Sequence, residues 1–460
     1  MINENLDAKY PIMPENIKLR DYQKQAIQAW FFNNGQGLYE MATGTGKTLT
    51  ALSTAAKLAE HLSSLAIIIV CPYTHLVDQW VKDIKKYNMD PIVAYKSKKL
   101  WNKRLSEEIT AFNTGLINHY CCITTNATFS SDAMQSEIRR IRGNVLIIAD
   151  EAHHLGSKQT IEILPVNIKF RLALSATPNR WYDDSGTQKL LKYFGGKVVF
   201  EYGLEKAIGT HLTNYYYFPH LVYLDSDEAE QYFEITNKLV KFMFGDEGLD
   251  FDDSGVSNLL IKRARILSMA RNKIQKLANL MKDRTDSLYN IVYCGDSKVD
   301  GEKQLDVVVD LLRKQFKMNV HTFTSREDKN LRSILLDEFE LGKLQALVAI
   351  KCLDEGVDVP ATQTAYILAS STNPREFIQR RGRVLRKHPL KEFSYIHDFI
   401  VLPRRIEDLP QVEPNVFNIE RNLLKREMAR FTEFAQLAMN GPEAHEKLNE
   451  IKHAYNLLDI

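Results

Sequence analysis

The stretch Met41-Ala42-Thr43-Gly44-Thr45-Gly46-Lys47-Thr48 decides how this chain folds. Its glycines let the backbone curl so that several N–H groups face one point, which is how a polyphosphate is cradled. We expect Lys47 to reach the terminal phosphates and the Thr48 hydroxyl to bind Mg²⁺. A helix is expected over residues 49–58, and its positive N-terminus favours an anion at the same point. The stretch therefore predicts a phosphate-binding loop between a strand and a helix.

A second segment completes this prediction. The apolar run Val145-Leu146-Ile147-Ile148 is typical of a buried parallel strand, and Asp150-Glu151-Ala152-His153 follows directly after it. We expect Asp150 to bind the metal and Glu151 to orient the attacking water. Alone, each segment also fits a simple turn or helix cap, and Met41 stands where the strict loop pattern has glycine. Together and in this order, they predict a nucleoside-triphosphate hydrolase.

Composition limits the class of protein. With 460 residues, of which 44% are hydrophobic, the chain suits roughly two to three domains with packed cores. Lys plus Arg number 60 and Asp plus Glu 58, so a nucleic-acid site would have to be a local groove. The five cysteines show no C-x-x-C spacing, and His153 and His154 are adjacent and point apart, so neither disulfides nor zinc are expected. There is no apolar run of about 18 residues, and a cytoplasmic protein is expected.

Short β-branched runs alternate with helical stretches in two separate regions. This alternation predicts an α/β fold with two tandem parallel-sheet lobes. The first lobe is expected over residues 1–203 and the second over residues 204–404, with a helical insertion near 225–285 that contains an acidic loop at 245–255. A helical tail is expected over residues 405–460, with a break at Asn440-Gly441-Pro442. The predicted strands are 38–39, 66–70, 120–124, 145–148 and 171–174 in the first lobe, and 290–294, 320–323, 346–350, 365–368 and 395–400 in the second.

Three further polar segments suggest contacts to a nucleotide. Leu19-Arg20-x-Tyr22-Gln23 precedes the phosphate loop, and a glutamine amide offers both a donor and an acceptor to an adenine edge. Ser175-Ala176-Thr177-Pro178 follows a first-lobe strand, where small hydroxyl residues suit coupling of nucleotide state to lobe position. The run Gln379-Arg380-Arg381-Gly382-Arg383-Val384-Leu385-Arg386 lies near the end of the second lobe. Arg383 and Arg386 are three apart, so on a helix they share a face and suit a transferring phosphoryl group.

This set of motifs, over roughly residues 17–403, resembles the core of superfamily 2 helicases of the DEAH-box type. That family has two RecA-like lobes with ATP between them and nucleic acid across both. The resemblance implies catalytic roles for Lys47, Asp150, Glu151, Gln379, Arg383 and Arg386. It implies ATP contacts for Arg20, Gln23, Thr43, Gly44, Thr45, Gly46, Lys47, Thr48 and Asp358, with Thr48 and Asp150 as ligands of Mg²⁺. It also implies coupling roles for His153, Ser175 and Thr177, and nucleic-acid contacts for Pro72, Gln79, Thr124, Thr125, Thr324 and Arg332.

Within the superfamily, residues 174–184 are similar to the XPB-like and restriction-type DNA translocases. Trp181 stands where XPB proteins have the glutamate of an Arg-Glu-Asp element, so the likeness is greater to bacterial restriction and phage-defence motors. We interpret the distant Arg326-Glu327-Asp328 as coincidence. The segment after Pro403 leaves no room for the winged-helix and ratchet domains of RNA-processing DEAH helicases.

The sequence thus predicts an ATP- and Mg²⁺-dependent DNA translocase or helicase, the motor of a bacterial restriction or phage-defence system. Two alternatives stay open, namely an RNA helicase and an ATP-gated DNA clamp that recruits a nuclease. No nuclease signature is visible, so a separate nuclease or defence-complex subunit is an expected partner, and a membrane is not. The basic runs 82–86 and 96–104 favour solvated helix faces, residues 215–218 a strand packed into the second lobe, and Met41 and Trp80 packing positions.

Overall fold

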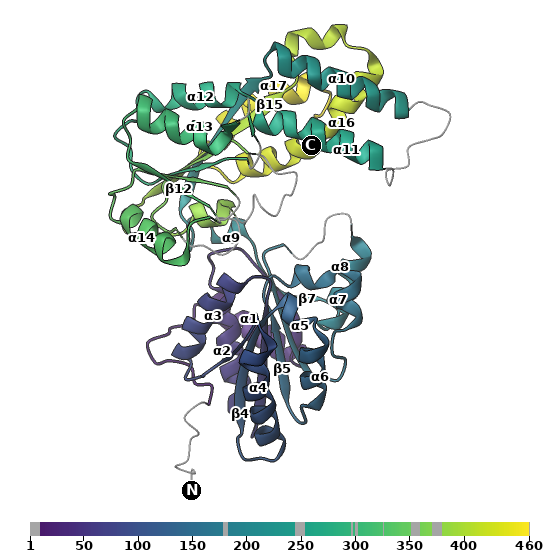
Figure 1. Ribbon diagram of the computed structural model, residues 1–460, viewed down its shortest axis with the longest axis vertical. Helices are drawn as coiled ribbons and strands as arrows, with labels where there is room; N and C mark the ends of the chain where they lie inside the picture. Colours follow the sequence, from purple (N-terminus) through teal and green to yellow (C-terminus); the bar gives the residue numbers. More distant parts are fainter. Residues whose placement is uncertain are drawn as a thin grey trace. The chain divides into compact units, whose positions relative to one another are not determined.

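The computed structural model describes residues 10–177, 183–243, 254–295, 298–299, 302–324, 326–350, 359–369 and 380–459. The chain divides into two compact units, Met1–Thr210 and His211–Ile460, which we call lobe 1 and lobe 2 (Figure 1). Each lobe is built on a parallel β-sheet with helices packed on its faces. The predicted α/β fold with two tandem parallel-sheet lobes is therefore confirmed.

The sheet of lobe 1 has seven strands, in the order β3-β4-β2-β5-β6-β1-β7, and every pairing is parallel. The strands are β1 (Gln36–Met41), β2 (Leu65–Cys71), β3 (Ile92–Ala94), β4 (His119–Thr125), β5 (Val145–Ala149), β6 (Phe170–Ser175) and β7 (Val198–Tyr202). No sequence pattern predicted β3 and β7, which are the two edge strands. β3 has only three residues and no residue of β7 is buried, so neither has the buried apolar run that marks β2 or β5.

Helices cover both faces of this sheet and form two separate cores. One face carries α1 (Asp21–Phe32), α2 (Lys47–Glu60) and α3 (Thr74–Lys86), and the other carries α4 (Lys98–Asn113), α6 (Asp132–Arg140) and α8 (Asp184–Tyr193). Short helical turns complete the lobe, namely α5 (Asn126–Phe129), η1 (Ala152–Gly156), α7 (Lys158–Glu162) and α9 (Leu204–Ala207). The helix α2 is buried on nearly all sides, because small residues such as Ala51, Ser53 and Ala55 let its neighbours approach closely. This packing fixes the loop that precedes α2.

The sheet of lobe 2 has six parallel strands in the order β12-β13-β9-β14-β15-β8. The strands are β8 (Asn214–Tyr223), β9 (Asn290–Tyr293), β12 (Val320–Phe323), β13 (Ala346–Ala349), β14 (Thr364–Ile367) and β15 (Phe393–Leu402). Separately, β10 (Lys298–Val299) pairs antiparallel with β11 (Glu302–Lys303). The aromatic cluster at residues 215–218 lies in β8, as predicted.

The helical insertion consists of α10 (Ser226–Met243), α11 (Ser254–Met269) and α12 (Asn272–Met281). The expected acidic loop at 245–255 lies almost entirely outside the described residues. The remaining helices of the lobe's body are α13 (Gln304–Asp310), η2 (Leu311–Gln315) and α14 (Lys329–Glu340). The core between α12, α13 and the sheet is formed by residues such as Leu277, Val292, Val308 and Val348.

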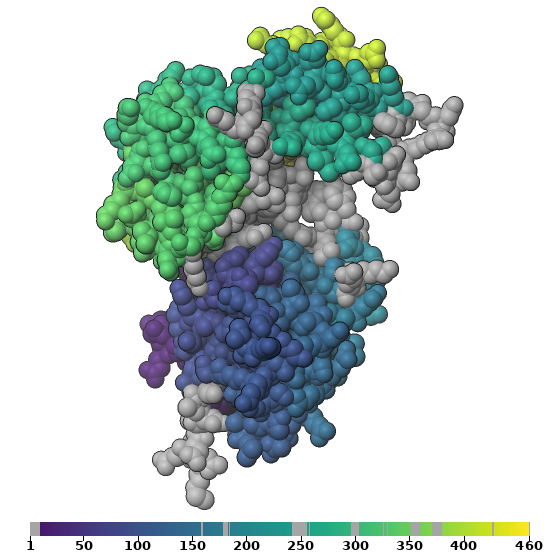
Figure 2. All heavy atoms as spheres, in the orientation of Figure 1, coloured from purple at the N-terminus to yellow at the C-terminus, as the bar shows by residue number. Residues whose placement is uncertain are grey.

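The tail consists of η3 (Ile406–Gln411), α16 (Pro414–Gln436) and α17 (Gly441–Ala454), with a break near the predicted position. It packs on lobe 2, where the space-filling view shows it in yellow against the teal α10 and α11 (Figure 2). Asn440 pairs with the edge strand β8, since its amide accepts a hydrogen bond from the Tyr217 N–H and donates one to the Tyr217 carbonyl, at 2.8 and 2.9 Å. The tail thereby covers a sheet edge that would otherwise offer free backbone groups.

The structure also bears on the expectations for the cysteines, for membrane spans and for metal ligands. Cys71, Cys121, Cys122 and Cys294 are free and buried, and Cys352 lies outside the described residues. Within the described part of the chain, no helix is long and apolar enough to span a membrane, and no group of three His, Cys, Asp or Glu side chains is placed to hold a metal ion. Met41 and Trp80 are buried, as predicted.

Glu40 provides a test of this arrangement. In β1 it lies directly opposite Glu201 of β7, and burial together with that carboxylate raises the pKa of Glu40 to about 6. The folded state binds this proton more tightly than the unfolded state, so the free energy of unfolding falls as the pH rises from 4.5 to about 6. Above that range Glu40 is ionised in both states, and the loss of stability is complete. We therefore expect Glu40→Gln to raise the free energy of unfolding of lobe 1 at pH 7.5 by on the order of 1 kcal/mol.

Urea denaturation at pH 7.5 and at pH 4 would measure this gain, which should vanish at the lower pH. Exposed Glu162 provides the control, and Glu162→Gln should change neither value. An equal gain for Glu40→Gln at both pH values would show that its charge is not the cause.

Candidate functional site

The predicted motifs of lobe 1 meet at one edge of its sheet. The strands β1, β2, β5 and β6 are parallel and end at Met41, Cys71, Ala149 and Ser175. Loops that follow parallel strands share the carboxyl edge of the sheet, which is where ligands bind in open α/β folds. The phosphate loop, the Asp150-Glu151 pair and the Ser175-Thr177 segment are therefore brought together.

The phosphate loop has the backbone that its glycines predicted. Gly44 and Gly46 have φ angles of 86° and 83°, in the left-handed region that glycine adopts without steric cost. The Thr45 hydroxyl donates to the Ala42 carbonyl at 2.7 Å and closes the loop. The helix α2 begins at Lys47, so Lys47 and Thr48 lie in its first turn. Among the described residues the buried Thr43 hydroxyl has no hydrogen-bond partner, which suits a loop shaped for a polar ligand.

Residues of α1 lie against this loop. The side-chain oxygen of Gln23 accepts the Arg20 N–H at 2.9 Å, and a Cβ atom on Gly46 would lie 2.9 Å from the side-chain nitrogen of Gln23. The Tyr22 hydroxyl donates to the Thr45 carbonyl at 2.6 Å, and its ring stacks on Tyr202 with centroids 4.0 Å apart. The structure thus places Gln23 beside the loop. Sequence analysis assigned no role to Tyr202, because it ends an edge strand with no distinctive pattern.

The two carboxylates are held by specific partners. Glu151 Oε1 lies 3.3 Å from Lys47 Nζ, with side chains only 16% and 10% exposed. Asp150 Oδ1 accepts the Glu151 N–H at 3.0 Å, and Asp150 Oδ2 accepts the Trp80 indole N–H at 2.8 Å. Glu151 has a φ angle of 42°, which is uncommon for a residue with a side chain. Lys47, Asp150 and Glu151 therefore form one connected group, and Trp80 belongs to it.

The surroundings separate the proton affinities of the two carboxylates. Burial and the neighbouring Glu151 raise the pKa of Asp150 to about 6, against the opposing effects of Lys47 and Trp80. Burial also opposes ionisation of Glu151, but Lys47, His153 and His154 outweigh it and hold the pKa of Glu151 below its usual value. Glu151 is accordingly ionised at neutral pH and can accept a hydrogen bond from water.

A chain of polar contacts leads away from Glu151. His153 Nδ1 lies 3.5 Å from Glu151 Oε2 and 3.3 Å from the Ser175 hydroxyl. The same hydroxyl accepts the Thr177 N–H at 3.1 Å. The three predicted coupling residues are therefore contiguous, and His153 links them to the carboxylate pair.

The arginine run of lobe 2 is described from Arg380 onward, and Gln379 and Asp358 lie outside the described residues. Residues 380–384 are helical, and Arg383 is 9% exposed. The helix ends before Arg386, whose backbone forms an isolated bridge with Leu212, so the prediction that Arg383 and Arg386 share a helix face was wrong. Burial lowers the pKa of Arg386 to about 10, and the side chain stays charged at neutral pH.

The predicted nucleic-acid contacts in lobe 1 differ in exposure. Pro72 directly follows β2 and Gln79 is exposed on α3, whereas Thr125 is only 6% exposed and its hydroxyl caps α5 by accepting the Thr128 N–H. Thr124, however, is fully buried, and its hydroxyl donates to the Ala94 carbonyl of β3 at 2.6 Å. The Thr124 side chain therefore packs within the sheet, and its prediction as a nucleic-acid contact was wrong.

In lobe 2, Glu327 organises the predicted contacts Thr324 and Arg332. Its carboxylate accepts the Thr324 N–H and hydroxyl at 2.6 and 2.7 Å, and its carbonyl accepts the Arg332 Nε–H at 2.9 Å. The Asp328 side chain caps α14. Glu327 and Asp328 of the Arg-Glu-Asp sequence thus shape this turn, and the structure brings Thr324 and Arg332 together.

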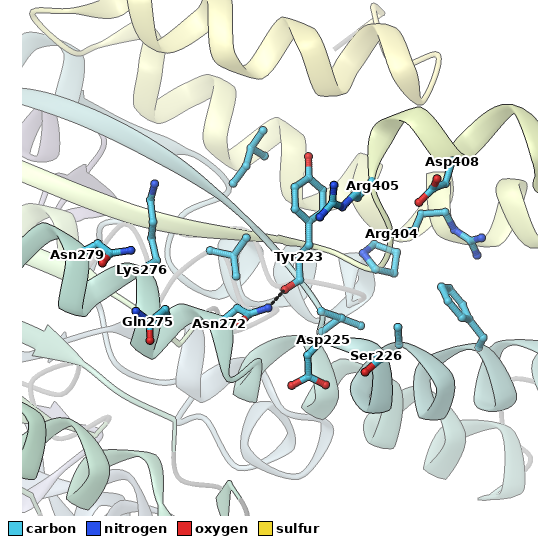
Figure 3. A pocket seen from close by; sticks show the side chains of 16 residues that line it. Tyr223, Asp225, Ser226, Asn272, Gln275, Lys276, Asn279, Arg404, Arg405 and Asp408 are labelled. Carbon is cyan, nitrogen blue, oxygen red and sulfur yellow. Dashed lines mark hydrogen bonds between the residues drawn. The ribbon is translucent and has the colours of Figure 1, made fainter.

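A pocket of about 480 Å³ lies elsewhere in lobe 2, at the carboxyl ends of β8 and β15 (Figure 3). Asn272, Gln275, Lys276 and Asn279 extend toward it from α12, and the Asn272 amide donates to the Tyr223 carbonyl at 2.9 Å. Its lining includes none of the predicted site residues.

Two segments of the chain match known protein families. Residues 16–180 match the family of type III restriction enzyme res subunits, and residues 272–388 match the helicase conserved C-terminal domain. The chain is 27% identical over 408 residues to DNA 3'-5' translocase XPB2 of Sulfurisphaera tokodaii, covering 84% of this chain and 83% of the relative. It is 24% identical to the putative DNA 3'-5' helicase Rad25 of Haloarcula marismortui, covering 81% of this chain and 51% of that relative.

Two solved structures share the fold. The type ISP restriction-modification enzyme LlaBIII bound to DNA superposes with a TM-score of 0.63 at 17% identity, over 97% of this chain and 33% of that one. The helicase domain of Pyrococcus furiosus Hef superposes with a TM-score of 0.53 at 17% identity, over 85% of this chain and 97% of that one. The two lobes are thus RecA-like, and the chain belongs to superfamily 2 of helicases and translocases.

Gly46 offers a test of the loop and its neighbour Gln23. Gly46→Ala and Gly115→Ala should both destabilise lobe 1 by about 1–2 kcal/mol, because both glycines are left-handed, at φ 83° and 75°. An added Cβ meets the Gln23 amide nitrogen at 2.9 Å in the first variant and nothing within 4 Å in the second. Only Gly46→Ala should therefore weaken binding of an adenine nucleotide. Urea denaturation measures the loss of stability, and nucleotide titration measures the affinity. Equal nucleotide affinity in both variants would show that Gln23 does not contribute to the nucleotide site.

Proposed function

We propose that this chain is an ATP- and Mg²⁺-dependent DNA translocase or helicase. The observation that carries the proposal is the connected group of Lys47, Asp150 and Glu151 beside a glycine loop at the carboxyl edge of the lobe 1 sheet. A lysine, a buried aspartate and an ionised glutamate at this edge are the groups that phosphoryl transfer to water requires.

The residues present fit both ATP and Mg²⁺. The Thr48 hydroxyl and the Asp150 carboxylate supply hard oxygen atoms, which Mg²⁺ prefers, and Trp80 fixes the orientation of Asp150. Bound Mg²⁺ would neutralise charge on the β and γ phosphates. Gly44, Gly46 and the buried Thr43 hydroxyl would surround the phosphates, and Arg20 and Gln23 would contact the adenine.

The hydrolytic step follows from the ion pair. Lys47 would exchange its contact with Glu151 for a phosphate oxygen, and Glu151 would then be free to orient the attacking water. His153 contacts both Glu151 and Ser175, and it would transmit this change to Thr177. Arg383 and Arg386, with Gln379 and Asp358, would take part in hydrolysis, as the family resemblance implies.

We propose DNA as the polymer. The support is the 27% identity over most of both chains to a protein named as a DNA 3'-5' translocase, together with a family described as restriction-enzyme subunits. Pro72, Gln79, Thr125, Thr324 and Arg332 would contact the sugar-phosphate backbone, which positions a polymer without reading its sequence. Restriction or phage defence in the cytoplasm, with a separate nuclease subunit, is the role we propose. An RNA helicase and an ATP-gated clamp are the competing outcomes of the tests.

Lys47→Ala and Glu151→Gln should separate binding from hydrolysis. Lys47→Ala removes the cation that balances the phosphates, so we expect hydrolysis to stop and ATP affinity to fall. Glu151→Gln leaves Lys47 and Asp150 in place, so we expect hydrolysis to fall while ATP affinity is kept or increases, because Lys47 loses its competing carboxylate. Nucleotide titration and a phosphate-release assay measure the two quantities. Equal loss of ATP affinity in both variants would refute these assignments.

The polymer can be identified from hydrolysis itself. We expect single-stranded or duplex DNA to stimulate ATP hydrolysis more than RNA of equal length, and binding to weaken steeply with salt because phosphate contacts release counterions. Arg332→Ala should reduce the stimulation and spare ATP binding, whereas Lys343→Ala, in the turn before β13, should change neither. A larger response to RNA would favour the RNA helicase. Stimulation without displacement of a triplex-forming strand would favour the clamp.

A further inference from the structure

The turn that carries Arg383 is attached to the C-terminal tail. The Arg381 side chain is completely buried, and its Nη2 donates to Glu433 Oε1 of α16 at 2.5 Å. Its guanidinium carbon lies 4.2 Å from the centre of the Phe434 ring, in cation–π contact. The two partners are adjacent on α16 and lie more than 50 residues further along the chain.

The neighbouring Arg380 is attached to a different element. Its Nη1 donates to the Ala369 carbonyl after β14 at 3.1 Å, and its guanidinium carbon lies 5.0 Å from the centre of the Tyr293 ring in β9. Consecutive helical residues point about 100° apart. The contacts of Arg380 and Arg381 therefore hold the helical turn at residues 380–384 on two different sides. Arg383 lies about 200° around the helix from Arg381, which sends it away from the tail.

The helix α16 is itself firmly held. Arg404 makes two hydrogen bonds to the buried Glu420 at 2.7 and 3.1 Å, and the Tyr215 hydroxyl of β8 donates to the Phe434 carbonyl at 2.6 Å. Arg430 of the same helix lies 3.8 Å from the buried Asp398 of β15. The contact to Arg381 is therefore made by an element that is fixed to the sheet.

A buried guanidinium needs an explanation. Removing the Arg381 charge from water is costly, and the carboxylate that compensates it, Glu433, is 48% exposed, so the pair is weak evidence for a purely stabilising role. A guanidinium that stacks on an aromatic ring and pairs with one carboxylate is, however, held in a defined orientation and at a defined distance from both. We call this contact of Arg381 with Glu433 and Phe434 the tether.

We propose that α16 is a positioning element for ATP hydrolysis, in which Glu433 and Phe434 hold Arg381 and thereby set the direction of Arg383. This inference rests on the proposed function, in which Arg383 takes part in ATP hydrolysis. Glu433 and Phe434 are positioning residues, because they act on the reaction only through Arg381. The tail is then part of the hydrolytic apparatus.

The test uses the full chain and three variants. Glu433→Gln removes the charge but keeps the shape, and Phe434→Leu removes the ring but keeps an apolar side chain. Both should lower kcat of polymer-stimulated hydrolysis by about tenfold, equal to about 1.4 kcal/mol, with ATP affinity within about twofold of the unchanged chain. Lys425→Gln is the matched control, because Lys425 lies on α16 and pairs only with the exposed Asp459 among the described contacts; it should change neither quantity.

A double-mutant cycle then assigns the effect. Arg381→Lys combined with Glu433→Gln should be no slower than the slower single variant, because both changes break one tether. Additive losses would overturn the proposal, and so would a fall in ATP affinity and unfolding temperature that parallels the fall in kcat. Variants that hydrolyse ATP as fast as the unchanged chain would overturn this inference alone. If the unchanged chain hydrolyses no ATP with any polymer, the proposed function fails and this inference fails with it.

Discussion

The ion pair between Lys47 and Glu151 is the contact on which the site of lobe 1 depends. It joins the phosphate loop to the segment after β5 at 3.3 Å, with both side chains largely removed from water. A pair this buried is favourable only when the surrounding groups satisfy both charges. The parallel order of β1, β6 and β5 makes the pair possible, because it brings the ends of these strands to one edge of the sheet.

Around that pair, specific contacts hold the two carboxylates. Trp80 directs Asp150, and the left-handed backbone of Glu151 turns its carboxylate toward Lys47. A residue with a side chain adopts that conformation only where its neighbours enforce it, and such strain is concentrated at functional sites. His153 then connects the pair to Ser175, so that a change in the contacts of Glu151 reaches a second strand end.

In lobe 2, too, specific contacts hold charged side chains, which here are arginines. Arg380 and Arg381 are neighbours in sequence, yet Arg380 donates to the Ala369 carbonyl after β14 and Arg381 forms an ion pair with Glu433 of α16. The tail that provides this second contact also covers the edge of β8 through Asn440. One segment thus closes the sheet against unwanted pairing and reaches the arginine run.

The amino-acid sequence by itself determined the two lobes, the long central strands and the glycine loop, because apolar runs and left-handed glycines are local properties of the chain. It also indicated Lys47, Asp150 and Glu151, whose spacing from neighbouring strands is local as well. Only the tertiary structure decided the contacts of Trp80 with Asp150 and of Arg381 with Glu433, which join residues 70 and 52 positions apart. It also showed that Thr124 faces the sheet and that the helix ends before Arg386, because the direction of a side chain depends on packing that no local pattern records.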